Sequence, residues 1–135
     1  MIRILVADDH PMIRKRIRQI ISEEADMEVC CEASGGWEAL DLLKEQEPDL
    51  VILDINMPDL SGLETLTKIR ALYTHLPVLM LTALSEGMYS TKAMKAGASG
   101  FISKESAGEE LVKTIRQIIE KPNKDAERNT SGKPR

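Results

Sequence analysis

Long hydrophobic runs are absent from this sequence of 135 residues. No apolar run approaches the roughly 20 residues that a membrane-spanning helix needs, and no signal peptide precedes the first strand-like stretch. We therefore expect a cytoplasmic protein that does not enter a membrane. A chain of this length with 42% hydrophobic and 30% charged residues is typical of one globular domain with its own core.

Aromatic residues, cysteine and histidine are scarce. Aromatic residues make up 3% of the chain, which disfavours a flavin site, and we expect the single tryptophan, Trp37, to be a packing residue. The two cysteines, Cys30 and Cys31, are neighbours on a strand-like stretch. Because consecutive strand residues point to opposite faces, we expect no disulfide between them. No cluster of cysteine and histidine suggests zinc, and we expect His10 to serve local structure and His75 to lie at the surface.

An excess of positive charge is also absent. The net charge is −4, and residues 1–121, with 14 basic and 20 acidic residues, carry −6. Such an acidic domain is a poor nucleic-acid binder by itself. Residues 122–135 contain no Leu, Ile, Val, Met, Phe, Tyr or Trp, so they cannot bury a core. We expect one domain over residues 1–121, followed by a flexible linker or tail over residues 122–135.

Stretches typical of strands alternate along the chain with stretches of helical spacing. Strands are predicted at residues 2–7, 27–33, 50–54, 77–82 and 101–103. Helices are predicted around residues 13–21, 37–46, 61–70, 86–96 and 107–121. The first helix has an apolar face (Ile13, Ile17, Ile20, Ile21) and a basic face (Arg14, Lys15, Arg16, Arg18). The alternation predicts an α/β fold with a five-stranded parallel sheet covered on both faces, doubly wound and flavodoxin-like, in the strand order 2-1-3-4-5.

Polar side chains follow the strands at one edge of this sheet. Asp8 and Asp9 follow the first strand, and Asp54 ends the third after four apolar residues. In the 2-1-3-4-5 order these two strand ends are neighbours at the switch point where such sheets bind ligands, so we expect one acidic pocket. Thr82 and Lys104 end the fourth and fifth strands and would border it. Asp54 alone could equally open a turn, but its companions favour a site.

This pocket has the chemistry of phosphoryl transfer. Three carboxylates repel one another unless a cation or protons intervene, and hard oxygen ligands beside an open side suit Mg²⁺. Lys104 offers a positive charge and Thr82 a hydroxyl group to phosphoryl oxygens, and Asp54 can act as a nucleophile that forms an aspartyl phosphate. No glycine-rich phosphate loop of the Walker type is present, so a nucleotide is not the expected donor.

Five sets of residues stand at the strand ends: Asp8-Asp9, Asp54 with Met57-Pro58 and Gly62, Thr82-Ala83, the stretch 96–101, and Lys104. In these motifs, residues 1–121 resemble the response-regulator receiver domains of two-component systems. The resemblance implies that Asp54 is the phosphoacceptor, assisted by Thr82 and Lys104. It implies that Asp9, Asp54 and the backbone carbonyl of Asn56 hold Mg²⁺, with Asp8 assisting through water. It further implies that Thr82 and Phe101 move when Asp54 is phosphorylated.

Two features are similar to the LuxR-type (NarL-type) branch of this family: the opening residues 6–11 and the step Lys104-Glu105, where many other receivers have proline. The resemblance implies a sensor histidine kinase as the donor, docked on the basic face of the first helix, and a homodimer on phosphorylation. It implies transcription as the output, through a DNA-binding helix-turn-helix domain that is absent from this chain. DNA is then a partner only through that domain, and no membrane partner is implied. Leu84, two residues after Thr82, is expected to hinder attack of water on the phosphate.

Two other functions fit parts of the pattern. A stand-alone receiver would act through protein contacts instead of an attached domain. An aspartyl-phosphate phosphatase would also use Asp54 as a nucleophile, but it needs a second acidic residue two positions later, where this chain has Asn56. We therefore expect a phosphorylation switch and not an enzyme that turns over an external metabolite.

Overall fold

The computed structural model of the chain describes residues 1–83 and 89–120, and its parallel strands are arranged in the order β2-β1-β3-β4-β5. The strands are β1 (Ile2–Ala7), β2 (Met27–Ala33), β3 (Leu50–Asp54), β4 (Val78–Thr82) and β5 (Gly100–Ser103). The helices are α1 (Pro11–Ser22), α2 (Gly36–Gln46), α3 (Gly62–Leu72), α4 (Ser90–Lys95), the 3₁₀ helix η2 (Lys104–Ser106) and α5 (Ala107–Glu120). The predicted α/β class and the predicted strand order are confirmed.

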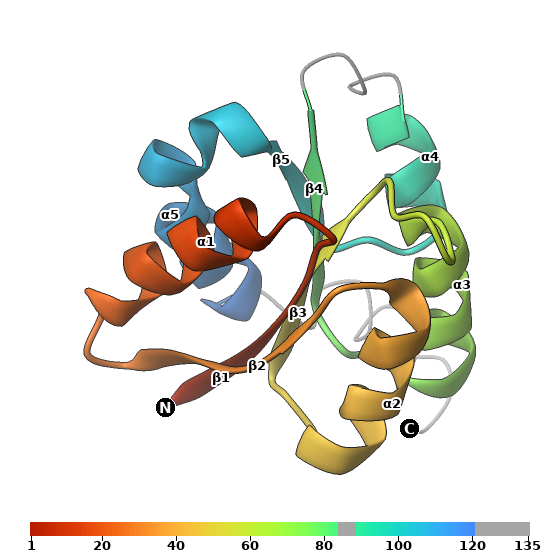
Figure 1. Cartoon of the computed structure of the whole chain (residues 1–135), viewed down its shortest axis with the longest axis horizontal. Coiled ribbons are helices and arrows are strands. Elements are labelled where there is room, and N and C mark those ends of the chain that lie inside the picture. Colours follow the sequence, from red (N-terminus) through yellow and green to blue (C-terminus); the bar gives the residue numbers. More distant parts are fainter. Residues whose placement is uncertain (84–88, 121–135) are drawn as a thin grey trace.

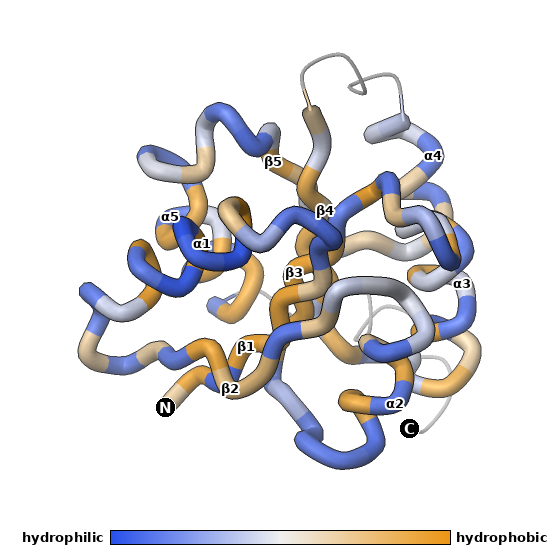
Figure 2. Tube along the Cα trace, viewed as in Figure 1, coloured by the Kyte–Doolittle hydropathy of each residue, from blue (hydrophilic) through white to orange (hydrophobic). Residues whose placement is uncertain are grey.

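Helices cover both faces of the sheet, with α1 and α5 on one face and α2, α3 and α4 on the other (Figure 1). Along each central strand, successive side chains point to opposite faces of the sheet. In β3, Leu50 and Ile52 pack towards α1 and α5, whereas Val51 and Leu53 pack towards the other helices. Every residue of β3 and β4 is buried, as near-continuous apolar runs predict, and Figure 2 shows hydrophobic residues concentrated along these strands.

The strand β2 is an outer strand, paired on one side only, and most of its residues are only partly buried. Its register with β1 shifts, so that Ile4 pairs with Val29 but Leu5 pairs with Cys31. Cys30 is the extra residue at this irregularity, which breaks the alternation of side chains. The Sγ atoms of Cys30 and Cys31 therefore lie 3.5 Å apart, and the expectation that they point to opposite faces is wrong. Both thiols are free, as expected.

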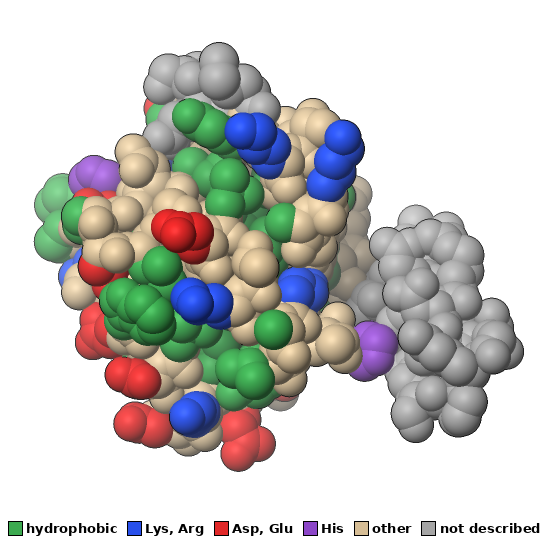
Figure 3. Space-filling view, turned by 90° about the vertical axis from the view of Figure 1, so that its right-hand side faces the viewer, with side chains coloured by type: hydrophobic (Ala, Val, Ile, Leu, Met, Phe, Trp, Pro, Cys, Tyr) green, Lys and Arg blue, Asp and Glu red, His purple; other side chains and the backbone are tan. Residues whose placement is uncertain are grey.

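The expectation that Trp37 is a packing residue is also wrong. Its side chain is 53% exposed, and the Nζ of Lys68 on α3 lies 5.3 Å from the ring centroid. The neighbouring Gly36 takes the position against α3, because a Cβ there would lie 2.3 Å from Thr65 Oγ1. On the side of the molecule that carries α2, α3 and α4, hydrophobic side chains reach the surface in patches between charged ones (Figure 3).

The helix α1 differs in detail from its predicted pattern. Ile17 and Ile21 are buried, whereas Ile13 and Ile20 are only partly so. The basic face is not uniformly solvated, because Arg14 donates from Nε to Glu32 Oε1 at 3.2 Å, and Arg18 also pairs with Glu32. The remaining two basic residues of this face, Lys15 and Arg16, are exposed, as is His75 elsewhere in the chain.

Some predictions concern residues beyond the described part of the chain. The predicted helix at residues 86–96 is described only from Ser90, since residues 84–88 lie outside the described ranges. Leu84 and the tail predicted at residues 122–135 lie outside them as well, so both stay predictions. In the described residues, no helix combines the length and the apolar character needed to cross a membrane.

Candidate functional site

The carboxyl ends of β1 and β3 bring Asp8 and Asp54 together. The two strands pair directly, with Ala7 opposite Leu53, so the residues that follow them lie side by side. The side chains of Asp8 and Asp54 are both fully buried. Two buried carboxylates in one place need compensating positive charge, because an isolated ionised carboxylate is costly to remove from water.

Backbone and side-chain contacts fix the position of Asp8. Its N–H donates to the carbonyl of Ala33 at 3.0 Å, and its own carbonyl accepts from Arg14 Nη1 at 2.6 Å. Its Oδ1 accepts the backbone N–H of His10 at 2.8 Å. The sequence indicated Arg14 only as part of a basic surface. The hydrogen bond from Arg14 to the Asp8 carbonyl depends on how α1 packs against the sheet, and a local sequence pattern does not reveal that packing.

The chain leaves the sheet directly after Asp54. The N–H of Ile55 donates to Leu81 at 3.0 Å, and its carbonyl accepts from Gly62 at 2.9 Å, which closes the base of the loop between β3 and α3. The N–H of Asn56 donates to Asp54 Oδ1 at 3.3 Å. A Cβ on Gly62 would lie 2.1 Å from the carbonyl oxygen of Asp54, so a larger residue cannot replace this glycine without moving the site.

The ammonium group of Lys104 faces both buried carboxylates, at 3.2 Å from Asp8 Oδ2 and 3.3 Å from Asp54 Oδ2. Burial and then the charge of Asp8 raise the pKa of Asp54 to about 6, although Lys104 opposes this rise. Burial lowers the pKa of Lys104, but the charges of Asp54 and Asp8 outweigh it and leave that pKa above its ordinary value. Lys104 therefore stays charged at neutral pH.

His10 also faces the carboxylates. It is the N-cap residue of α1, and its Nδ1 lies 2.9 Å from Asp8 Oδ1 and 3.2 Å from Asp9 Oδ1. The same nitrogen lies 3.4 Å from Lys104 Nζ. These contacts agree with a role in local structure. The ring lines the mouth of the pocket in addition, together with Ile13, Asp54, Asn56, Ala83 and Lys104.

The acidic residues fit a hard divalent cation. Ligand atoms of Asp8, Asp9, His10 and Asp54 all lie within 4.8 Å of one another. Among the described residues, three buried side-chain oxygens accept no hydrogen bond of good geometry: Asp8 Oδ2 and Asp54 Oδ2, which face Lys104 Nζ, and Asp9 Oδ1, which faces His10 Nδ1. The single charge of Lys104 does not balance three carboxylates. Clustered carboxylate oxygens that are not satisfied by hydrogen bonds are ligands that Mg²⁺ prefers, so the residues present fit the predicted ion.

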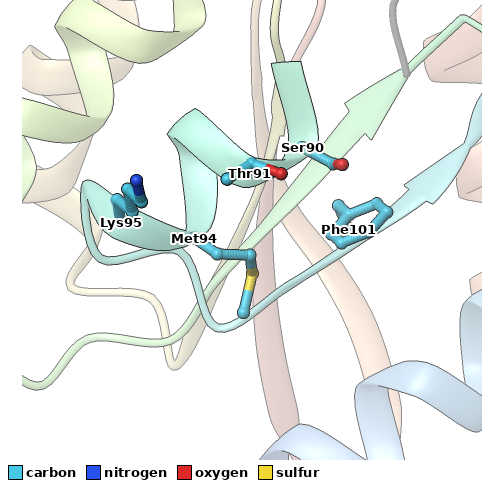
Figure 4. A pocket seen from close by; sticks show the side chains of 5 residues that line it. All are labelled: Ser90, Thr91, Met94, Lys95 and Phe101. Atoms are coloured by element: carbon cyan, nitrogen blue, oxygen red, sulfur yellow. The ribbon is translucent and has the colours of Figure 1, made fainter. Parts of the chain in front are cut away.

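The remaining predicted site residues lie at the same edge of the sheet but not all in the pocket. Asn56 is exposed and lines the pocket mouth. Thr82 ends β4 and is buried, and Ala83 lines the pocket beside Asp54 in its place. Phe101 pairs with Met80 in the sheet and is 44% exposed. Its ring faces outward towards α4, where it lines a groove with Ser90, Thr91, Met94 and Lys95 (Figure 4).

Comparison with known proteins connects this geometry to a family. Residues 4–116 match the model of the response regulator receiver domain. The chain is 38% identical over 114 residues to the nitrate/nitrite response regulator protein NarL of Escherichia coli, a match that covers 84% of this chain and 53% of that protein. It is 35% identical over 119 residues to the response regulator GacA of Pseudomonas aeruginosa, covering 88% and 56%. The chain thus spans about half the length of these curated relatives.

Solved structures agree with the sequence comparison. A two-component response regulator of the LuxR family from Aurantimonas sp. SI85-9A1 has a TM-score of 0.82 and 35% identity to this chain, covering 87% of this chain and 84% of that one. The relatives are response regulators, and several are of the LuxR/NarL type. The chain therefore belongs to the response regulator receiver domain family of two-component systems.

Proposed function

We propose that this chain is a phosphorylation-switched receiver that accepts a phosphoryl group from a sensor histidine kinase on Asp54. The observation that carries the proposal is the place of Asp54. It is a buried carboxylate at the carboxyl end of a central strand, it lines an open pocket, and Lys104 lies 3.3 Å from its Oδ2. Its Oδ1 accepts the N–H of Asn56, whereas its Oδ2 faces the Lys104 ammonium group without a well-aligned hydrogen bond.

In the transfer step, a carboxylate oxygen of Asp54 attacks the phosphorus of the donor phosphohistidine. A new O–P bond forms as the P–N bond breaks, the imidazole leaves with that electron pair and takes a proton from water, and Asp54 becomes an acyl phosphate. With a pKa of about 6, Asp54 is ionised at neutral pH and ready to attack. Lys104 places positive charge where phosphoryl oxygens gather negative charge.

Asp9, Asp54 and the backbone carbonyl of Asn56 would hold Mg²⁺, and Asp8 would assist through water. When bound, the ion supplies positive charge for the carboxylates and for the phosphoryl oxygens. The buried carboxylate oxygens of Asp9 and Asp54 that accept no well-aligned hydrogen bond support this assignment. His10 is the weaker candidate in the cluster, because imidazole is a poor ligand for a hard, oxygen-preferring ion.

The switch would run from Asp54 towards β4 and β5. A phosphoryl group adds up to about two negative charges, and these would draw in the Thr82 hydroxyl and the Lys104 ammonium group. Phe101, which is exposed beside α4, would then move inward. The surface formed by α4, β5 and α5 would change its affinity for partners, which is how a local charge becomes a signal.

The wider setting of the switch is part of the same proposal. Residues 1–121 would be the receiver domain, and residues 122–135 would lead to a DNA-binding domain that is absent from this chain. The relatives are about twice as long as the matched region, which supports this arrangement. The exposed Lys15 and Arg16 on α1 would steer the kinase towards the pocket. Phosphorylation would favour a homodimer, and the protein would act in the cytoplasm.

Intact-mass spectrometry tests the phosphoacceptor role. The protein is incubated with acetyl phosphate, a small phosphoryl donor, with and without Mg²⁺. We expect one added phosphoryl group in the presence of Mg²⁺, none after chelation, and none in Asp54→Asn. Asp41→Asn, which changes an exposed carboxylate on α2, is the matched control and should be phosphorylated normally. An adduct of equal size in Asp54→Asn would contradict the proposal.

A further inference from the structure

The loop of residues 55–61 joins β3 to α3 and carries Asn56. Its base is closed by the two hydrogen bonds of Ile55 described above. At its far end, Ser61 begins α3 with a capping box, accepting from Glu64 N–H at 3.1 Å while Glu64 Oε1 accepts from Ser61 N–H. Between these fixed ends, Met57 and Leu60 are buried, but Asn56 and Asp59 are exposed.

Asp59 connects the middle of this loop to the start of α2, which is distant in sequence but adjacent in space. Its Oδ1 accepts the N–H of Gly36 at 3.0 Å, and its Oδ2 accepts the N–H of Trp37 at 3.3 Å. Its Oδ1 also accepts the N–H of Leu60 at 2.8 Å, which fixes the carboxylate relative to its own loop. The first turn of α2 has no cap from its own N-cap residue, Gly35. Asp59 therefore serves as the cap of α2 from 22 to 23 residues away.

Two consecutive glycines make room for this contact. A Cβ on Gly35 would lie 2.6 Å from both carboxylate oxygens of Asp59. A Cβ on Gly36 would lie 2.3 Å from Thr65 Oγ1 and 2.9 Å from Leu60 Cβ. Gly35 is extended, with φ −163°, so any residue can adopt its backbone conformation. Both positions therefore need glycine for lack of space: Asp59 occupies the space at Gly35, and Leu60 and the α3 residue Thr65 occupy the space at Gly36.

We propose that Asp59 is a positioning residue for the metal site: by binding the start of α2, it holds the loop so that the carbonyl of Asn56 is placed to bind Mg²⁺. The inference rests on the proposed role of Asn56 as a metal ligand. Asn56 lies between the fixed Ile55 and the anchored Asp59, so the contact with α2 limits the backbone conformations that Asn56 can reach. Residues that orient metal ligands without touching the metal commonly change metal affinity when they are replaced.

The first test compares Mg²⁺ affinity in Asp59→Ala and wild type by isothermal titration calorimetry. We expect the dissociation constant for Mg²⁺ to rise about tenfold, at the lower end of the roughly 10- to 100-fold effects of such residues. Asp49→Ala is the matched control. Asp49 is an exposed aspartate that also accepts a backbone N–H, from Arg3 at 2.8 Å, but at the opposite edge of the sheet. Asp49→Ala should leave the Mg²⁺ affinity within about twofold of wild type, because residues that are not coupled to a site change its energetics only slightly.

A second variant tests the same contact without changing the charge. In Gly35→Ala, the new methyl group meets the Asp59 carboxylate and displaces it from α2. We expect Gly35→Ala to weaken Mg²⁺ binding in the wild-type background, but to have little further effect in Asp59→Ala. Such non-additivity is the signature of two residues acting through one contact. Amide hydrogen exchange at Gly36 and Trp37, measured without Mg²⁺, should be faster in both single variants.

The outcomes separate this inference from the proposed function. Weaker Mg²⁺ binding in Asp59→Ala and Gly35→Ala, with a non-additive double variant, supports the positioning role even if acetyl phosphate does not modify Asp54. Unchanged Mg²⁺ affinity overturns the positioning role, even if exchange at Gly36 becomes faster and Asp54 is phosphorylated normally. An equal loss of Mg²⁺ affinity in the control Asp49→Ala would overturn it too. So would additive effects of Asp59→Ala and Gly35→Ala in the double variant. If Asp59→Ala does not fold, Gly35→Ala and Asp59→Asn decide the question by the same measurement.

Discussion

The Nζ of Lys104 lies 3.3 Å from Asp54 Oδ2, although the two residues belong to different strand ends and are 50 positions apart in the chain. The same nitrogen lies 3.2 Å from Asp8 Oδ2, so one lysine bridges two buried carboxylates. Removing Lys104 would leave two buried carboxylates without a compensating positive charge, which is costly. Lys104 thus serves both the stability of the site and the chemistry proposed for it.

Lys104→Met should slow phosphorylation of Asp54 by acetyl phosphate. The variant keeps much of the length of the side chain but removes the charge that would balance the phosphoryl oxygens. Loss of one such electrostatic contact typically lowers a rate by about 10²- to 10³-fold. The rate is measured by intact mass over time at saturating Mg²⁺. Lys113→Met, which removes an exposed charge on α5, should behave as wild type, and an unchanged rate in Lys104→Met would exclude a chemical role for Lys104.

Asp54→Asn should stabilise the metal-free protein at neutral pH. The pKa of Asp54 is raised to about 6 in the folded chain, so between about pH 4 and pH 6 the folded state binds more protons than the unfolded state. The contribution of Asp54 to the free energy of unfolding is therefore present below about pH 4 and is lost as the pH rises through about 6.

The free energy of unfolding of Asp54→Asn should exceed that of wild type by about 1–2 kcal/mol at about pH 7.5, less than the full cost of ionising a buried carboxyl group with a pKa of about 6, because the pairing with Lys104 is lost. At about pH 4.5 the gain should largely disappear. Urea denaturation at both pH values, in the presence of a chelator, measures the difference. Asp41→Asn should show no such pH dependence. A destabilised Asp54→Asn at neutral pH would mean that the ion pair outweighs the cost of burial.

Mg²⁺ should raise the thermal unfolding temperature, and the rise should depend on pH. Ligand at about 100 times its dissociation constant adds about 2.7 kcal/mol to the free energy of unfolding, which corresponds to roughly 8–16 °C for a domain of this size. Below about pH 6, protons compete with the ion for Asp54, so the same concentration should give a smaller shift. Differential scanning fluorimetry of wild type and Asp9→Asn measures this. An equal shift at about pH 5 and about pH 7.5 would argue that Asp54 is not a ligand.

Gly62→Ala should destabilise the protein strongly. The added Cβ would lie 2.1 Å from Asp54 O and 2.5 Å from Ile55 Cα, and both are backbone atoms that cannot move aside alone. We expect the free energy of unfolding to fall by about 3 kcal/mol, which is the upper end of the range for overpacking. Gly108→Ala is the control, because its Cβ meets only the flexible end of Arg16 and a helix favours alanine. Urea denaturation should show Gly108→Ala to be neutral or stabilising, and a mild effect of Gly62→Ala would contradict the tight closure of the loop.

The fold could be predicted because the central strands β1, β3 and β4 are short, largely apolar runs that end at a polar residue or directly before one. Leu50–Asp54 is the clearest case, since four apolar residues bury the strand on both faces and the carboxylate marks the edge. Parallel pairing then brings strand ends together, so Asp8 and Asp54 could be expected in one pocket without any contact being known. The predicted strand order was therefore enough to predict where the site lies.

The contacts that local patterns could not reveal are those between distant loops and helices. The bond of Arg14 to Asp8 O and the bonds of Asp59 to Gly36 and Trp37 depend on how α1 and α2 pack. The adjacency of Gly35 and Gly36 is the one sequence signal that could have indicated a close approach at the start of α2. The exposure of Trp37 follows from the same packing, because Gly36 and not Trp37 fills the space against Thr65 of α3.

The measurement that tests the central claim most directly is chemical mapping of the phosphorylated residue. After incubation with acetyl phosphate and Mg²⁺, sodium borohydride reduces an acyl phosphate to an alcohol, which converts a phosphorylated aspartate to homoserine. Peptide mass spectrometry should then find homoserine at position 54 and aspartate at positions 8, 9 and 59. Homoserine at position 8 or 9, or none at position 54 in a protein that has gained a phosphoryl group, would contradict the assignment of Asp54 as the phosphoacceptor.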